Sequence, residues 1–345
     1  MPLVRGVFLR VLVTGGMGFI GSNFIHHLLS SQGGVEVVNL DNLSYGSNPN
    51  NLKDFVGDGR YTFVKGSIAD FALVSKLVGD ADVVVNFAAE THVDRSIVDP
   101  TPFLQTNTFG AFNLLEACRK YRVRLLHVST DEVYGDIVAG SFTEKDRLNP
   151  SNPYSATKAA ADLLVVAYHR TYGVDALVTR CTNNFGPYQF PEKLLPKVIV
   201  RARLGLKAPV YGSGKNIRDW IYVQDHCEAL WTVLQKGRAG EVYNISAGNE
   251  YDNLTLVKKV LELMGKDESF IEFVEDRPGH DLRYSLDSTK IRSELGWRPR
   301  FNFDEALKFT VEWYLKNEWW WKPLVSEELL HPTPWKLDRT IRVKR

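Results

Sequence analysis

Short, largely apolar runs alternate with longer segments of helical composition through the first half of the chain. Apolar runs of this length are typical of a parallel sheet covered on both faces. Their alternation with helices predicts a doubly wound α/β domain. The predicted strands are Val11–Val13, Val35–Leu40, Val83–Phe87, Leu125–Val128 and Ala176–Thr179. The predicted helices are Gly21–Ser31, Phe71–Val78, Pro102–Tyr121 and Tyr154–Tyr172.

The pattern changes after about Asn184, where Pro, Gly and Lys become frequent between shorter elements. Val242–Ile245 has the composition of a strand that returns to the main sheet, whereas Leu254–Met264 and Asp304–Lys316 predict helices of a smaller lobe. We therefore expect a Rossmann domain with a smaller, mixed C-terminal lobe. The expected boundaries are 7–184 for the first domain, with returning segments near 216–246, then 185–215 and 247–330 for the lobe, and 331–345 for a C-terminal arm.

Composition and charge narrow the class of protein. The 345 residues carry a net charge of +1, with 44% hydrophobic and 24% charged residues, so the basic excess of nucleic-acid and membrane-surface binders is absent. The three cysteines form no C-x-x-C pair, and the N-terminal apolar run is too short for a membrane span and lacks a signal-peptide cleavage pattern. We therefore expect a cytoplasmic protein with no nucleic-acid or membrane partner. The histidines lack H-x-x-x-H spacing, so no metal is expected.

A glycine-rich segment joins the first predicted strand to the first predicted helix. Gly16, Gly18 and Gly21 have the spacing of a dinucleotide-binding G-x-G-x-x-G turn, and Gly15, Gly18 and Gly21 also fit a G-x-x-G-x-x-G variant. Such glycines let the backbone approach a pyrophosphate at a helix N-terminus. Asp41 ends the second strand, where a carboxylate accepts ribose hydroxyls and repels a 2′-phosphate. The expected cofactor is NAD and not NADP, because Asp41 would repel the 2′-phosphate and no Arg follows within Asn42–Ser44. The alternative of an ordinary turn with a surface Asp is disfavoured, because strand, glycines, helix and acid are all in register.

Two groups of polar residues follow predicted strands. Asp131 and Glu132 come just after Leu125–Val128, at the edge of the sheet where ligands bind, although an acidic pair is also compatible with a solvated turn. Tyr154 and Lys158 are four residues apart and share one helix face. Bringing a tyrosine pKa to neutrality takes about 4 kcal/mol, which an ammonium and an oxidised nicotinamide would supply together. We therefore expect a tyrosine base beside the dinucleotide site.

These motifs resemble the extended short-chain dehydrogenase/reductase family, in the branch that acts on nucleotide sugars. Within that branch, five segments resemble the dTDP-glucose 4,6-dehydratases, and the likeness runs from about Arg10 to about Leu315. The Thr-Asp-Glu triplet at 130–132 is the most discriminating, because epimerases of this superfamily lack the acidic pair and sugar-acid decarboxylases usually carry Ser at position 131. The five segments are Phe87–Ser96, Ser129–Gly135, Asn183–Tyr188, Arg218–Trp220 and Asp276–Asp281.

The resemblance implies a lyase that dehydrates dTDP-glucose to dTDP-4-keto-6-deoxyglucose, for deoxysugar biosynthesis of the rhamnose type. It implies tightly bound NAD and no net redox change. In that mechanism Tyr154 takes the proton of the sugar 4-hydroxyl, with Lys158 beside it, and Thr130 binds the C4 oxygen. Glu132 then removes the C5 proton, while protonated Asp131 donates to the departing 6-hydroxyl. The two acids must therefore titrate differently.

The resemblance also implies the binding residues. Arg218 and Arg277 suit a nucleoside diphosphate, which needs cationic donors, although Arg218 and Asp219 are equally compatible with a structural ion pair. The implied cofactor-binding residues are Gly15, Gly18, Phe19, Ile20, Gly21, Asp41, Asn42, Ser44, Ser67, Ile68, Ala88, Ala89, Thr106, Tyr154, Lys158 and Asn184. The implied substrate-binding residues are Thr91, Thr130, Asn183, Lys193, Leu194, Tyr211, Arg218, Asn253, Arg277 and His280.

Three positions depart from the family pattern. Ser67 stands where an acid usually faces the adenine amino group, so adenine recognition is expected to rest on the backbone or on Asp70. Thr91 replaces a Ser, and Phe185 replaces a Tyr, which removes one hydroxyl near the site. None of the three belongs to the proton-transfer set.

Other functions and two modes of assembly stay open at this point. A UDP-sugar 4,6-dehydratase or 4-epimerase would share the family, and a non-catalytic NAD-binding regulator is disfavoured because Tyr154 and Lys158 are both present. The helices beginning at Pro102 and Tyr154 are apolar nearly all round, so their outer faces need a cover. We expect the cover to be a second copy, in a homodimer formed through these two helices, and the alternative cover is the C-terminal segment with Trp319–Trp321.

Overall fold

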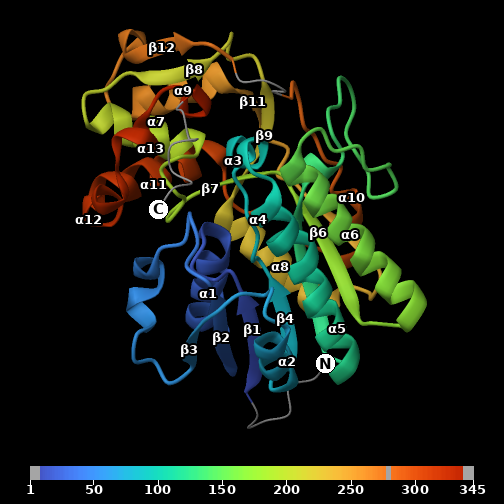
Figure 1. The fold of residues 1–345 in the computed structure, drawn as a ribbon. Coiled ribbons are helices and arrows are strands. Elements are labelled where there is room, and N and C mark those ends of the chain that lie inside the picture. The colour runs from blue at the N-terminus through green and yellow to red at the C-terminus, as the bar shows by residue number, and fades with distance from the viewer. Residues whose placement is uncertain (1–7, 277–280, 337–345) are drawn as a thin grey trace.

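The computed structural model describes residues 8–276 and 281–336. Seven parallel strands form its central sheet, in the order β10-β6-β5-β4-β1-β2-β3 (Figure 1). The order reverses between β1 and β4, and this switch point opens a crevice at the carboxyl ends of the strands. The strands are β1 (Leu9–Thr14), β2 (Val35–Asp41), β3 (Tyr61–Lys65), β4 (Val83–Asn86), β5 (Arg124–Thr130), β6 (Ala176–Cys181) and β10 (Val242–Ile245).

Helices cover both faces of the sheet, which confirms the predicted doubly wound, Rossmann-like fold. Alternate residues of a strand serve the two faces: Val11 and Val13 pack in one apolar cluster, and Leu12 packs in the other. One face is covered by α1 (Phe19–Ser31), α8 (Val223–Lys236) and α10 (Thr289–Leu295). The other is covered by α2 (Phe71–Gly79), α5 (Ala111–Tyr121) and α6 (Pro153–Tyr172).

Strand β3 was not predicted, and its exposure explains the omission. It lies at the edge of the sheet, and none of its five residues is buried. An edge strand of this kind carries no continuous apolar run, so a search for buried strands passes over it.

The helix predicted over Pro102–Tyr121 is helical throughout but is not one α-helix. It begins as α4 (Thr101–Phe103), continues as the π-helical segment η2 (Leu104–Gly110), and becomes α5. The π-helical segment carries Asn107, whose side chain bonds the backbone N and O of Glu90 and also Thr157 Oγ1 on α6. The wider turn thus ties the loop after β4 to the helix that carries Tyr154, as is common for π-helices near functional sites.

The smaller lobe has its own apolar core. Its sheet is β11-β9-β7, formed by β7 (Asn183–Phe185), β9 (Ile217–Tyr222) and β11 (Glu250–Asp252), beside the pair β8 (Ala208–Tyr211) and β12 (Ile271–Val274). Its main helices are α7 (Leu194–Arg203), α9 (Asn253–Leu263) and α11 (Phe303–Lys316). The last two match predicted helices within one residue at each end. Strand β9 lies at the seam, because Ile221 packs in the core of the main sheet, whereas Trp220 and Tyr222 pack in the core of the lobe.

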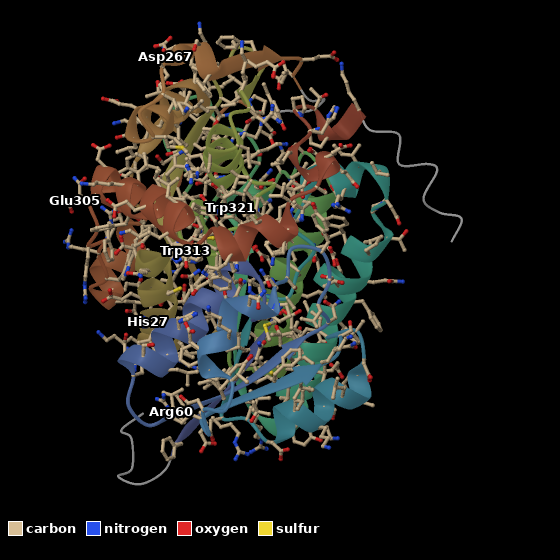
Figure 2. All side chains as sticks on the ribbon, turned by 90° about the vertical axis from the view of Figure 1, so that its left-hand side faces the viewer. His27, Arg60, Asp267, Glu305, Trp313 and Trp321 are labelled. Carbon is tan, nitrogen blue, oxygen red and sulfur yellow. The ribbon has the colours of Figure 1, made fainter. Side chains whose placement is uncertain are left out.

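The C-terminal tryptophans belong to this second core. Trp320 and Trp321, on α12 (Glu318–Trp321), are buried there, and Trp320 Nε1 donates to Asn51 Oδ1 at 2.7 Å (Figure 2 labels Trp313 and Trp321). Trp319 remains 42% exposed. The segment therefore does not cover α5 and α6, and that alternative is wrong. Within the described residues, no helix has the length and apolar character needed to cross a membrane.

Candidate active site

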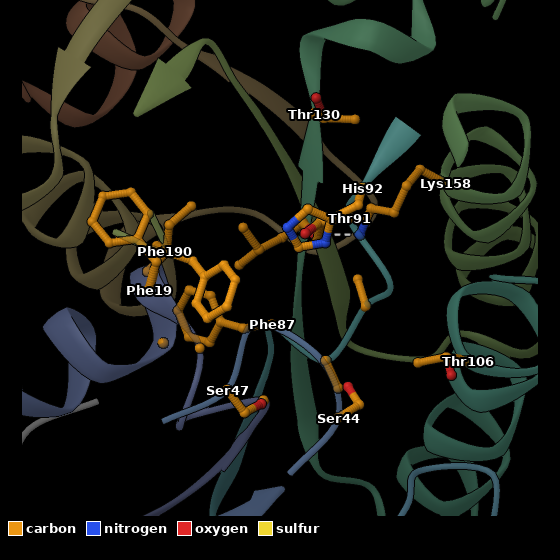
Figure 3. A pocket seen from close by; sticks show the side chains of 18 of the residues that line it. Phe19, Ser44, Ser47, Phe87, Thr91, His92, Thr106, Thr130, Lys158 and Phe190 are labelled. Carbon is orange, nitrogen blue, oxygen red and sulfur yellow. Dashed lines mark hydrogen bonds between the residues drawn. The ribbon is translucent and has the colours of Figure 1, made fainter. Parts of the chain in front are cut away.

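A cavity of about 270 Å³ opens at the carboxyl ends of β1, β2, β4 and β5. Every residue that the sequence assigned to cofactor binding lines it, from Gly15 to Asn184. Figure 3 shows Thr106 and Lys158 on one side of this cavity and Phe19 and Phe190 on the opposite side. The local motifs of the first domain therefore converge on one place.

Glycine is required in the turn between β1 and α1. Gly15 has φ +71°, and a Cβ there would lie 2.6 Å from the backbone N of Ala88. A Cβ on Gly21 would lie 2.4 Å from the carbonyl oxygen of Gly15. Helix α1 starts after Gly18 without a side-chain cap, so its first N–H groups face the cavity beside Phe19 and Ile20. A backbone turn with free N–H groups at a helix N-terminus fits a pyrophosphate.

Asp41, at the end of β2, is hydrogen-bonded to the turn after β1 and to the loop that follows β2. Its carboxylate accepts hydrogen bonds from Met17 N (2.9 Å), Leu43 N (2.7 Å) and Ser47 Oγ (3.1 Å). Burial raises its pKa, and these hydrogen bonds oppose the rise. Each carboxylate oxygen has more than one lone pair, so Asp41 still has capacity to accept from a ribose that lies in the cavity.

The structure separates Ser67 from Asp70. Ser67 lines the cavity, and its Oγ accepts from Ala69 N at 3.1 Å. Asp70 lies outside the cavity lining and caps α2 by accepting from Leu73 N. Of the two alternatives for adenine recognition, the structure therefore favours the backbone near Ser67, because Asp70 caps a helix and does not line the cavity. The backbone near Ser67 remains the expected site of adenine recognition.

The acidic pair sits where β5 ends. Asp131 and Glu132 open the 3₁₀ turn η3 (Asp131–Val133), and Thr130 Oγ1 caps it by accepting from Glu132 N at 3.3 Å. Thr130 Oγ1 also donates to Asp131 Oδ1 at 3.2 Å. Burial, followed by the charge of Glu132, raises the pKa of Asp131 to about 8. The pair is thus no solvated turn, and Asp131 has the protonation expected of a general acid at neutral pH.

Tyr154 and Lys158 lie on the first turns of α6. The helix start is fixed by Pro153 and by a capping box between Asn152 and Ser155. Lys158 Nζ donates to the carbonyl oxygen of Val128 at 2.7 Å. Burial and then the charge of Glu132 raise the pKa of Tyr154 well above its ordinary value, so the expected lowering is not found in the protein alone. Burial raises the pKa of Tyr154 more than its hydrogen bond with Thr130 lowers it. A further positive charge beside the hydroxyl would be needed to favour the phenolate.

A second cavity of about 200 Å³ joins the first. His92, Glu132, Asn183 and Lys193 line both. The predicted substrate residues divide between them: Thr91 and Thr130 line the first, whereas Leu194, Tyr211, Arg218 and Asn253 line the second. Arg277 and His280 lie outside the described residues. Glu132 therefore stands where the two cavities meet.

Arg218 does not pair with Asp219. Its guanidinium donates to the carbonyl oxygens of Ile217 (2.7 Å) and Asp281 (2.9 Å) and lies 4.4 Å from the ring centroid of Tyr284. The Asp219 carboxylate instead accepts from the backbone of residues 248 and 249. Neighbouring side chains of a strand point to opposite faces, which separates the two charges. The structural ion pair is therefore wrong, and Arg218 lines the second cavity.

Several residues around the cavities were not singled out in the sequence. His92 Nε2 lies 3.3 Å from Glu192 Oε2, and Tyr45 packs edge-on against His92. Lys197 donates to the carbonyl oxygen of His331 at 2.6 Å, and burial lowers its pKa to about 8. Only His92 lay in a recognised motif. Phe185 lines neither cavity, because it packs in the lobe core against Tyr222 and Phe303.

The fold and the site define a Rossmann-like α/β protein with a buried Tyr–Lys pair and an acidic pair between two joined cavities. The chain belongs to the GDP-mannose 4,6 dehydratase family, which matches residues 12–310. A dTDP-glucose 4,6-dehydratase of Streptomyces niveus is 50% identical over 325 residues, which cover 93% of this chain and 97% of that protein.

Two further proteins agree with this membership. The low-salt glycan biosynthesis protein Agl12 of Haloferax volcanii is 53% identical over 309 residues, covering 89% of this chain and 99% of the relative. The crystal structure of DesIV, a dTDP-glucose 4,6-dehydratase from Streptomyces venezuelae with NAD and TYD bound, has a TM-score of 0.90 at 48% identity. That match covers 92% of this chain and 100% of DesIV.

Proposed function

We propose that this protein is an NAD-dependent lyase that converts dTDP-glucose to dTDP-4-keto-6-deoxyglucose for deoxysugar, rhamnose-type, biosynthesis. The observation that carries the proposal is the acidic pair Asp131 and Glu132 at the junction of the two cavities, beside Tyr154. Relatives named for this activity, at about half identity over nine tenths of the chain, support it.

The first cavity fits NAD. The glycine turn and the uncapped start of α1 would hold the pyrophosphate, Asp41 would bind the adenosine ribose, and Lys158 and Tyr154 would face the nicotinamide end. Bound there, NAD supplies a hydride acceptor that later returns the hydride to the sugar. Its positive ring would also favour the Tyr154 phenolate, which burial opposes in the protein alone.

Proton transfers are assigned to this chain's own residues. Tyr154 removes the proton of the sugar 4-hydroxyl, and Thr130 holds the C4 oxygen. Glu132 then removes the C5 proton, which the neighbouring ketone has made acidic. Asp131 gives its proton to the departing 6-hydroxyl, and water leaves. A proton then returns to C5 when the hydride has returned to C6, which completes the 4-keto-6-deoxy sugar. A carboxyl group with a pKa of about 8 is mostly protonated at pH 7, which is the state this step requires.

The second cavity has the polar and cationic lining expected of a site for the nucleoside diphosphate part of the substrate. Lys193 and Arg218 bring positive charge to it, and Asn253 and Tyr211 add polar groups. Arginine and lysine donors are the usual partners of phosphate oxygens. The sugar would then reach the junction at Glu132 and Asn183, where the two cavities meet.

The decisive experiment offers dTDP-glucose and UDP-glucose separately to the NAD-loaded protein. We expect a 4-keto-6-deoxy product from dTDP-glucose, with no accumulation of NADH. A product formed from UDP-glucose alone would favour the UDP-sugar alternative, and a 4-epimer would favour the epimerase. Stoichiometric NADH would overturn the internal redox cycle in favour of a simple dehydrogenase.

We also propose a cytoplasmic homodimer built on the outer faces of η2, α5 and α6. Exposed apolar side chains gather there, with Leu163 61% and Phe109 51% exposed, beside Phe112 and Leu104. Apolar surface of this kind is stabilised by burial against a two-fold copy. Leu163→Asp should yield monomers by light scattering at micromolar concentration, whereas Leu263→Asp, on an exposed face of the lobe, should not. A monomeric wild type would refute the dimer.

A further inference from the structure

Helix α6 carries a third ionisable residue, Asp162, in line with Tyr154 and Lys158. Asp162 follows Lys158 by four residues, as Lys158 follows Tyr154, so all three share one face of the helix. All three side chains are buried, and Asp162 is completely so. A carboxylate in such a position is costly unless it is paired and hydrogen-bonded.

Arg180 on β6 pairs with Asp162. Arg180 Nε donates to Asp162 Oδ2 at 2.8 Å, and the same guanidinium donates to Tyr134 Oη at 2.7 Å. Burial raises the pKa of Asp162, but the charge and hydrogen bond of Arg180 oppose the rise. Asp162 Oδ1 lies 3.7 Å from His127 Nε2, and hydrogen bonding by the Ser129 side chain also helps to lower the pKa of Asp162. One oxygen is thus anchored, and the other faces an imidazole.

The hydrogen bonds behind His127 fix its tautomer. Thr14 Oγ1 donates to Asn86 Oδ1 at 2.6 Å, so Asn86 presents its Nδ2 donor to His127 Nδ1 at 3.0 Å. Nδ1 must therefore accept, and the ring proton is on Nε2, toward Asp162. Burial and then the charge of Lys158 lower the pKa of His127 well below its ordinary value. His127 is neutral and contributes an N–H dipole, not a charge.

Asp162 is the anion that offsets the burial of Lys158. Burial lowers the pKa of Lys158 to about 8, and Asp162 and then Cys181 raise it. Burial holds the pKa of the Cys181 thiol at about 12, so that group carries no charge near neutrality. The titratable groups that interact with Lys158 are Asp162 on α6, His127 on β5 and Cys181 on β6. Tyr154 shares the helix face of Lys158, Arg180 on β6 is bound to Asp162, and the acids Glu132 and Asp131 on η3 act on Tyr154.

We propose that Asp162, anchored by Arg180, is a positioning residue that keeps Lys158 charged and directed at the site. It touches neither cavity and acts only through Lys158. The consequence for turnover rests on the proposed function, because it requires a charged Lys158 beside the Tyr154 phenolate. Arg180 keeps Asp162 ionised, and His127 directs an N–H at its second oxygen.

The first test needs no substrate. Lysine labelled with ¹³C at Cε would report the titration of Lys158 by NMR, with the signal assigned through Lys158→Arg. In Asp162→Asn we expect its midpoint to fall by about one pH unit, because an opposite charge that favours the ammonium is gone. Asp162→Glu should restore most of the shift. Asp225→Asn, another buried carboxylate whose partners are the backbone N–H groups of Arg300 and Phe301, should leave the midpoint unchanged.

The second test is the pH profile of dehydration. In Asp162→Asn the part of the alkaline limb that belongs to Lys158 should move down by about one unit, so activity at pH 8 falls by about fivefold with KM unchanged. Should this variant fail to fold because Arg180 is left unpaired, Asp162→Asn with Arg180→Gln replaces the ion pair by a neutral hydrogen bond and should show the same shift. A folded variant with an unmoved Lys158 midpoint overturns the proposal. A wild type that titrates as expected but does not turn over dTDP-glucose overturns only the proposed function.

Discussion

The two cavities are built from different parts of the protein. The first is shaped by backbone: a glycine turn, the start of α1 and the ends of parallel strands, all within the first half of the sheet. The second is shaped by long side chains from α7, β8, β9 and α9, which meet only when the lobe folds. A site shaped by backbone tolerates few substitutions, because any added side chain meets main-chain atoms. A site lined by long side chains is expected to lose ligand affinity gradually, one substitution at a time. Glu132 lines both cavities and links the two kinds of site.

The largest loss of activity is expected from substitution of Tyr154, which lines the first cavity. Tyr154→Phe removes one hydroxyl from a site whose core packing does not depend on it, so turnover should fall by about 10³-fold or more while the melting temperature is nearly unchanged. The measurement is initial rate on dTDP-glucose beside a thermal melt. Activity near the wild-type level would assign the base to another group.

Glu132→Gln tests the proposed base at C5, which lies where the two cavities meet. Oxidation at C4 should persist, whereas elimination should drop by about 10²–10³-fold, since the C5 proton has lost its base. Exchange of the C5 hydrogen with deuterated solvent, followed by NMR or mass spectrometry, separates the steps. Exchange at the wild-type rate in this variant would remove Glu132 from that role.

Gly15→Ala tests the glycine turn between β1 and α1, where the backbone shapes the first cavity. The added methyl group meets the backbone of Ala88 at 2.6 Å and forces a non-glycine residue to φ +71°. We expect NAD affinity to fall by about 10- to 100-fold, with sugar-nucleotide affinity much less affected. Calorimetry with each ligand measures both. Gly205→Ala serves as the control, because its φ is +75° and no atom lies within 4 Å of its added Cβ.

Arg218→Met probes the side-chain wall. Loss of a charged donor to the diphosphate should raise KM by about tenfold or more, with little change in kcat or in retained NAD. Arg218→Lys should recover part of the affinity, since it keeps the charge but not the fork of donors. A fall in kcat at unchanged KM would place Arg218 with the proton-transfer groups instead.

The smallest effect concerns pH. Asp131 must be protonated to act as an acid, and its pKa of about 8 lies above neutrality. The active form of Asp131 therefore predominates below pH 8. Lys158, whose pKa is also about 8, must be charged, so loss of both active forms should lower the rate by about a hundredfold per pH unit well above pH 8. Asp131→Asn should reduce that slope to about tenfold per unit, at a low residual rate, because only the limb that belongs to Lys158 is left. A slope unchanged in that variant would exclude Asp131 as a source of the alkaline limb.

The sequence alone determined the main sheet and the first cavity. Buried parallel strands are continuous apolar runs, and a dinucleotide turn is a local pattern of glycines, so both are visible within short stretches of chain. The Thr130–Glu132 triplet and the Tyr154–Lys158 spacing were visible for the same reason. The exposed edge strand β3 and most elements of the lobe carried no such local signal.

Only the tertiary structure decided which distant residues meet. It placed Arg218 in the lining of the second cavity, and it bonded the Asp219 carboxylate to the backbone of residues 248 and 249. It buried Trp320 and Trp321 in the lobe, and it set Arg180 and His127 around Asp162. Burial is the largest cause of the raised pKa of Asp131 and of the lowered pKa of Lys158, and burial depends on the whole surrounding fold.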